Sequence, residues 1–196
     1  WIQTRIDTDG RRGLFVLTGS QQFGLLDRVS QSLAGRVGFL HLLPFSRAEL
    51  APSQPDARLE DALWKGGYPP IYDRGVPPHV WFADYMATYV ERDVRQLVNV
   101  RDLAQFHRFV QLAAGRTGQL LNLSSLAADC GINHNTAAAC ISVLEASYLV
   151  VRLQPFHKNY GKRLTKAPKL YFLDPGLAAW LCGVREADQL LSGPMR

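Results

Sequence analysis

The first part of this chain of 196 residues contains two patterns of apolar residues, continuous runs and residues at helical spacing. Two continuous apolar runs, at residues 14–20 and 37–43, flank a stretch in which apolar residues recur at helical spacing from Phe23 to Leu33. Continuous apolar runs are typical of strands that are buried on both faces of a parallel sheet. The pattern therefore predicts two parallel strands joined by a helix in a right-handed crossover.

The following part of the chain favours helices over strands. Short helices are expected at residues 46–50 and 59–64, and longer ones at residues 78–97 and 103–114. Prolines in the turn at residues 66–70 prevent the second short helix from continuing.

Residues 123–144 predict two short helices with a tight turn between them. Gly131 suits the turn, and Asn133 is a good N-cap for the second helix. Two strand-like runs follow, at residues 148–151 and 170–173, joined by a basic stretch. Two short helices followed by a hairpin are what a winged helix requires.

The basic stretch sharpens this interpretation. No carboxylate occurs between Glu145 and Asp174, so the segment carries +6 in a chain whose net charge is +5. Concentrated positive charge favours contacts with phosphate, and DNA is the expected partner. The alternative is a solvated hairpin whose lysines only keep the protein soluble. The six cations are Arg152, Lys158, Lys162, Arg163, Lys166 and Lys169.

The second helix of this pair limits how DNA would be recognised. Among its expected outward positions, only Asn135 is a side-chain type that commonly reads base edges. We therefore expect weak or sequence-neutral binding.

Composition narrows the class of protein. Apolar residues make up 47% of the chain, which is enough for a core, and no apolar run is as long as a membrane span. Without a signal-peptide pattern, we expect a cytoplasmic protein that does not bind membranes. Cys130, Cys140 and Cys182 have no metal-site spacing, so buried free thiols are expected and no metal site is assigned.

Five short motifs are spread along the chain, namely LTGSQ at 17–21, SLAGR at 32–36, GGYP at 66–69, YVERD at 89–93 and YFLDPGL at 171–177. Together they resemble prokaryotic AAA-family ATP-binding proteins, of the archaeal-ATPase-like type, that carry a C-terminal domain of unknown function. The resemblance implies the C-terminal strands of a P-loop AAA core, an α/β remnant, at residues 1–50. A helical region at 51–118, a winged helix-turn-helix at 119–182 and a linker at 183–196 would follow.

The sequence contains no GxxxxGK[ST] phosphate loop. The resemblance implies that this loop lies upstream and a nuclease-like domain downstream, so ATP and Mg²⁺ would bind the full-length protein and not this fragment tightly. It also places Ser20, with Thr18 and Gln21 nearby, where such ATPases orient the attacking water or the γ-phosphate. A strand that ends in Thr-Gly-Ser is otherwise an ordinary turn.

Arg36 follows the expected helix end, where AAA-type proteins often carry an arginine finger. Such an arginine neutralises charge on a transferring phosphoryl group of a neighbouring subunit, which implies a homo-oligomer. The alternative is a cation that is favoured at a helix C-terminus by the helix dipole.

Two functions remain open from the sequence. The first is an ATP-binding protein whose nucleotide state is coupled to a winged helix that contacts DNA. The second is a stand-alone winged-helix module that binds DNA or protein without catalysis.

Overall fold

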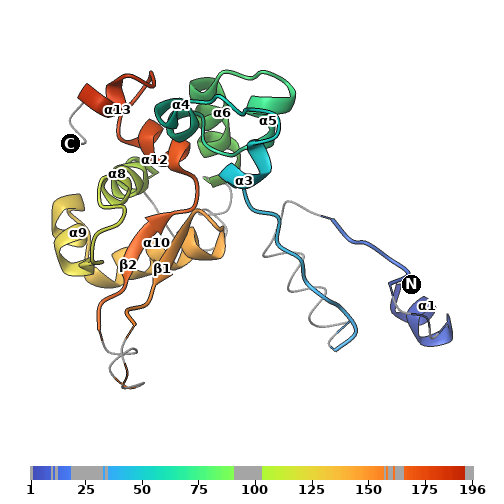
Figure 1. Cartoon of the computed structure of the whole chain (residues 1–196). Coiled ribbons are helices and arrows are strands. Elements are labelled where there is room, and N and C mark those ends of the chain that lie inside the picture. Colours follow the sequence, from blue (N-terminus) through green and yellow to red (C-terminus); the bar gives the residue numbers. More distant parts are fainter. Residues whose placement is uncertain are drawn as a thin grey trace. The chain divides into compact units, whose positions relative to one another are not determined.

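The computed structural model describes most of the chain, and it falls into two compact units, Trp1–Leu42 and Leu43–Arg196 (Figure 1). Each unit is described by itself below. The described residues are 2–9, 11, 13–18, 33, 35–90, 103–156, 158, 161 and 166–192.

The first unit begins with helix α1 (Ile2–Asp9). The two strands expected in it are not seen, because the described residues 13–18 and 35–43 are neither helix nor strand. Their apolar side chains face solvent, and Leu40 and Leu42 are 95% and 99% exposed. A parallel strand needs neighbouring strands and covering helices, and the described residues supply neither to these segments. The helix expected from Phe23 lies outside the described residues except for Leu33.

The second unit opens with short helices, each started by local chemistry. Ser46 caps α3 (Arg47–Leu50) in a capping box with Glu49. Prolines occupy the first turns of α5 (Pro69–Asp73) and α6 (Pro78–Tyr85), where a missing N–H costs nothing. The expected helix at 78–97 continues as a π-helical turn, η1 (Met86–Val90), and its last part lies outside the described residues. The remaining helix of this group is α4 (Leu59–Lys65).

Three helices and a hairpin form the centre of the second unit (Figure 1). Helix α8 (Leu103–Ala114) packs on α9 (Leu123–Cys130) and α10 (His134–Ala146), and α10 packs on strand β1 (Val150–Leu153). Between α9 and α10, Gly131 adopts a φ of 70°, a left-handed conformation that glycine adopts readily. The Asn133 side chain accepts a hydrogen bond from the Thr136 N–H at 2.8 Å, as its predicted capping role requires.

Strand β1 pairs antiparallel with β2 (Lys169–Phe172). Val150 lies opposite Phe172 and Leu153 opposite Lys169, so the register is fixed along both strands. Helix α12 (Pro175–Leu181) follows β2 directly and packs on α4, and α13 (Gln189–Ser192) comes last.

The core of the second unit lies where α6, α8, α9, α10 and α12 meet the inner side of the hairpin. Its fully buried members include Phe82, Phe106, Phe109, Leu126 and Leu144. All three cysteines are free thiols. Cys130 and Cys140 are buried and Cys182 is half-buried. Burial raises the pKa of Cys140 to about 11, so this thiol stays protonated and inert at neutral pH.

Candidate functional site

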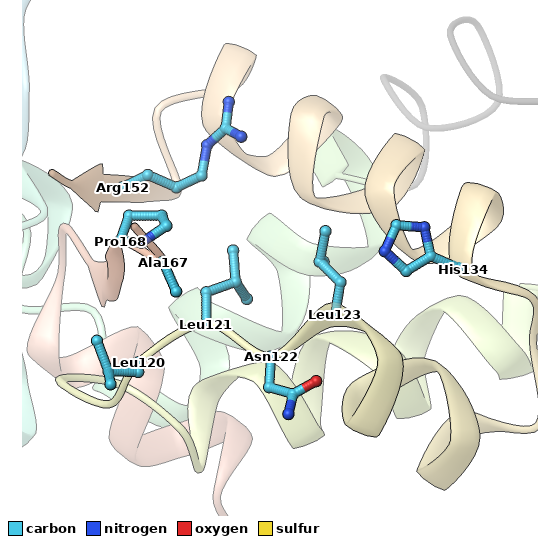
Figure 2. A pocket seen from close by; sticks show the side chains of 8 residues that line it. All are labelled: Leu120, Leu121, Asn122, Leu123, His134, Arg152, Ala167 and Pro168. Carbon is cyan, nitrogen blue, oxygen red and sulfur yellow. The ribbon is translucent and has the colours of Figure 1, made fainter. Parts of the chain in front are cut away.

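The start of α9, the start of α10 and the base of the hairpin surround a hollow of about 470 Å³ (Figure 2). Asn122 caps α9 by accepting a hydrogen bond from the Ser125 N–H at 3.0 Å. Figure 2 shows His134 entering from the first turn of α10 and Arg152 from the strand on the other side. The hollow is lined by Leu120, Leu121, Asn122, Leu123, His134, Arg152, Ala167 and Pro168.

Two of the predicted nucleic-acid contacts lie at or beside this hollow. Arg152 lines it, and Asn135 is an exposed residue next to His134 on α10. Arg152 is not available as an unpaired cation, because its Nε donates to Glu145 Oε2 at 2.8 Å and its guanidinium forms an ion pair with that carboxylate. Counting charges along the sequence missed this pair, because Glu145 lies just outside the carboxylate-free segment and meets Arg152 only where α10 packs on β1.

The remaining predicted cations belong to the hairpin. Lys158, Lys166 and Lys169 are exposed, whereas Lys162 and Arg163 lie outside the described residues. Exposed lysines without a nearby carboxylate in sequence keep their charge available for an anionic partner.

The residues predicted to sense nucleotide belong to the first unit. Thr18 is exposed, and Ser20 and Gln21 lie outside the described residues. Arg36 is exposed and lies in a turn. Its backbone N–H donates to the Leu33 carbonyl at 3.0 Å, and its guanidinium pairs with Asp7.

A second site, which the sequence did not single out, is the buried carboxylate of Asp174. This residue is only 2% exposed. Its Oδ2 accepts from the Gly67 N–H at 2.6 Å, and its Oδ1 accepts from the Leu177 N–H at 2.7 Å as the N-cap of α12. Burial raises the pKa of Asp174 to about 6, and the backbone N–H groups of Gly67, Leu177 and Gly176 oppose that shift.

Glycines allow the backbone to approach this carboxylate. Gly66 has a φ of 68°, and a Cβ there would overlap Asp174 Oδ1. A Cβ on Gly176 would lie 2.6 Å from the Gly66 nitrogen and 2.8 Å from Cζ of Phe82, closer than such atoms can come. The GGYP and YFLDPGL motifs are therefore in direct contact, although they lie about a hundred residues apart.

The Gly-Gly turn makes two further hydrogen bonds within the second unit. The Gly67 carbonyl accepts a hydrogen bond from the Phe45 N–H at 2.7 Å, and the Gly66 carbonyl accepts from the Tyr72 hydroxyl at 2.5 Å. We call the set Phe45, Gly66, Gly67, Asp174 and Gly176 the carboxylate joint. An Asp-Pro helix start and a Gly-Gly turn are visible in the sequence, but only the fold shows that they meet.

Two absences can be stated for the described part of the chain. No group of three or more His, Cys, Asp or Glu residues there could hold a metal ion. None of the helices described is long and apolar enough to cross a membrane.

Two parts of the chain each match the model of a known protein family. Residues 1–51 match an AAA domain, and residues 56–188 match a domain of unknown function, DUF8612. The Uncharacterized protein Mb2031c of Mycobacterium bovis and the Uncharacterized protein Rv2008c of Mycobacterium tuberculosis are each 31% identical over 196 residues. These alignments cover 98% of this chain but 43% of each relative, so the chain spans less than half their length. No solved structure matches significantly.

The AAA match supports an AAA-like character for the first segment, which the motifs had indicated. The second match covers well over half of the chain. The chain therefore belongs to the DUF8612 family.

Proposed function

We propose that this chain is part of an AAA-type ATP-binding protein in which the nucleotide state is coupled to a nucleic-acid-binding winged helix. The carboxylate joint carries this proposal. It connects Phe45, inside the segment matched to the AAA domain, to Asp174, which lies two residues beyond strand β2 of the basic hairpin.

The joint is suited to coupling because it is stiff. The Gly67 carbonyl accepts a hydrogen bond from Phe45, and the Gly67 N–H donates one to the buried carboxylate of Asp174. Because Gly67 has no Cβ, its backbone lies directly against the backbone of Phe45. A displacement of residue 45 would have to be followed by the start of α12, since closely packed interiors transmit displacement instead of absorbing it. The hairpin would move with α12, because Asp174 lies only two residues beyond β2.

The nucleic-acid part of the proposal rests on the arrangement at residues 119–182. Helices α9 and α10, the turn at Gly131 and the antiparallel hairpin have the order of a winged helix, and exposed lysines lie along the hairpin. Lys166 and Lys169 would contact phosphate, whereas Arg152 would instead hold the hairpin against α10 through Glu145.

The experiment uses a full-length protein that contains this chain. The affinity for a labelled DNA is measured by anisotropy with ADP, with a non-hydrolysable ATP analogue and without nucleotide. We expect affinities that differ by about 5- to 150-fold between nucleotide states, the usual range of allosteric coupling. Replacing both Lys166 and Lys169 by Gln should weaken binding and lower the log–log salt slope by about one per lost phosphate contact, leaving ATP turnover unchanged. Absence of binding at low salt would overturn the nucleic-acid assignment.

The second candidate function is a winged-helix module that binds without any nucleotide control. The core of the second unit is formed by residues of that unit, and this observation favours a module that acts by itself. DNA binding that is identical in all nucleotide states would select this candidate over the first.

A further inference from the structure

Strand β1 is the outer strand of the hairpin sheet. On its far side β2 bonds to the chain just before α9, since the Leu170 carbonyl accepts from the Gly118 N–H at 2.6 Å and the Leu170 N–H donates to the Gln119 carbonyl at 3.0 Å. Leu170 and Arg152 lie opposite each other without mutual hydrogen bonds, so the backbone groups of Arg152 point away from β2. This direction repeats at every second residue, so the backbone groups of Gln154 point to the same open side.

The open edge of β1 is unprotected. In the part of the chain that the structure describes, no hydrogen bond joins the backbone N–H or carbonyl of Arg152 or Gln154 to another group. Edge strands usually carry lysine, proline or a covering segment that keeps other strands away. Strand β1 contains no lysine or proline, and the charge of Arg152 is neutralised by Glu145. Unpaired backbone groups at such an edge are a template for a further strand.

Burial determines how far a further strand can pair along this edge. Val150 is only 1% exposed, so its backbone groups are covered and out of reach. Arg152 is half-buried, Leu153 is 57% exposed and Gln154 is exposed. The edge that a partner can reach is therefore formed by residues 152–154.

The charge of these three residues favours an uncharged strand as the partner. Because Arg152 already pairs with Glu145, residues 152–154 offer no unpaired cation that would attract an acidic peptide. Leu153 and Gln154 are neutral. A neutral strand with the same alternation of apolar and polar side chains is complementary to this edge, and β1 of a second copy of the chain is such a strand.

Antiparallel pairing about Leu153 satisfies both copies equally. Arg152 lies opposite Gln154 of the second copy in this register, and the two residues exchange both backbone hydrogen bonds. The guanidinium of Arg152 is then next to a neutral amide, so no like charges are opposite each other. Each Leu153 lies opposite its own copy, which removes two exposed apolar side chains from water. The basic hairpins extend in opposite directions, which keeps their lysines apart.

We propose that two copies of this chain associate through the open edges of β1, in antiparallel register about Leu153, to form one continuous sheet. The inference goes beyond the proposed function, because the association needs neither nucleotide nor nucleic acid. An edge of this length buries little surface, so the association is weak and depends on protein concentration. The two basic hairpins are related by a two-fold axis in this dimer.

Cross-linking of the 196-residue chain tests the register. Leu153→Cys should give a covalent dimer on mild oxidation with diamide, because opposite residues without mutual hydrogen bonds have Cα atoms about 4.5 Å apart, within reach of a disulfide. Leu120→Cys is the matched control, since Leu120 is 64% exposed but lies on the other side of β2, and it should stay monomeric. The original chain, whose cysteines are buried or half-buried, should also stay monomeric under diamide.

Sedimentation equilibrium measures the association itself. Leu153→Lys should raise the dissociation constant of the dimer by about tenfold or more, because it removes an apolar pair and places like charges opposite each other. Leu120→Lys should leave the constant unchanged, and circular dichroism checks that both variants fold. An original chain that stays monomeric at its highest soluble concentration would overturn the proposal. A dimer that tolerates Leu153→Lys, or equal cross-linking of the two cysteine variants, would overturn it as well.

Discussion

Each of the two units of this chain contains strongly apolar stretches, and these stretches differ in how far they are buried. In the second unit, apolar side chains from α8, α9 and α10 form a core in which Phe109 and Leu126 are fully buried. In the first unit, runs with an equally apolar pattern leave Leu40 and Leu42 in solvent. The difference shows that a hydrophobic pattern predicts the need for burial, whereas the partner that provides it must come from elsewhere in the fold.

The largest effect is expected from a substitution in the first unit, measured in a longer protein that hydrolyses ATP. In a full-length protein that contains this chain, Arg36→Ala should lower ATP turnover about a thousandfold or more with ATP binding retained, because an arginine finger stabilises the transition state. Steady-state ATPase rates and nucleotide binding would be measured side by side. Arg11→Ala is the control, since Arg11 is also exposed and also pairs with a carboxylate, Asp9. Near-normal turnover in Arg36→Ala would make Arg36 a helix-end cation.

The second prediction concerns the core of the second unit. Phe109→Ala should reduce the free energy of unfolding of the 196-residue chain by about 3–5 kcal/mol, because it leaves a cavity in a fully buried position. Urea titration followed by circular dichroism measures this change. A loss below about 1 kcal/mol would mean that the second unit is packed no better than the first.

The third prediction is a pH dependence at the carboxylate joint. The pKa of Asp174 is raised from 3.8 to about 6 by burial, so its stabilising contribution is complete below pH 3.8 and is lost as the pH rises through 6. Relative to Asp174→Asn, the original chain should therefore lose about 2 kcal/mol of unfolding free energy between pH 4 and pH 7.

Urea titrations at several pH values measure this difference, in which the titration of other carboxylates cancels. Asp188→Asn serves as control, because Asp188 is exposed and pairs with Arg58 at the surface. A difference between the original chain and Asp174→Asn that stays constant with pH would show that Asp174 is ionised equally in the folded and unfolded chain.

The smallest effect is expected in the first unit. Leu40→Ser should change the stability of the 196-residue chain by less than about 0.5 kcal/mol, since the side chain is in solvent. In a full-length protein, the same substitution should cost about 1–3 kcal/mol if the segment becomes a buried strand there. Thermal melts of both proteins compare the two losses of stability. Equal losses in the two proteins would contradict the prediction that this segment forms a buried strand.

Local signals in the sequence predicted several helices of the second unit, although α5 and α12 were not among them. The cap at Asn133, the glycine at 131 and the apolar period of 103–114 act over a few residues, so they can be interpreted without the fold. The cations of the hairpin were visible in the same way. The strands of the first unit were predicted from pattern alone, which does not say whether a sheet is present to receive them.

Contacts between distant parts of the chain were not predictable by these means. The pair Arg152–Glu145 depends on how the hairpin lies on α10, and the burial of Asp174 depends on α4 packing against α12. Gly66 and Gly176 looked like ordinary turn and helix residues, because only their approach to other backbones excludes a side chain. The structural roles of these residues follow from contacts between distant parts of the chain, which residue type alone does not reveal.

The hydrogen bond between Gly67 and Asp174 also sets an order of events during synthesis. It joins residues 107 positions apart, so the Gly-Gly turn leaves the ribosome about 5–20 s before its partner at usual translation rates. Over that interval α9, α10 and β1 can close on near neighbours, while α4 and the turn lack their contacts with Asp174 and α12. Closing so long a loop adds an entropic cost that local pairs avoid. The joint forms late, so a nascent chain that stops before residue 174 leaves α4 and the Gly-Gly turn open to proteases.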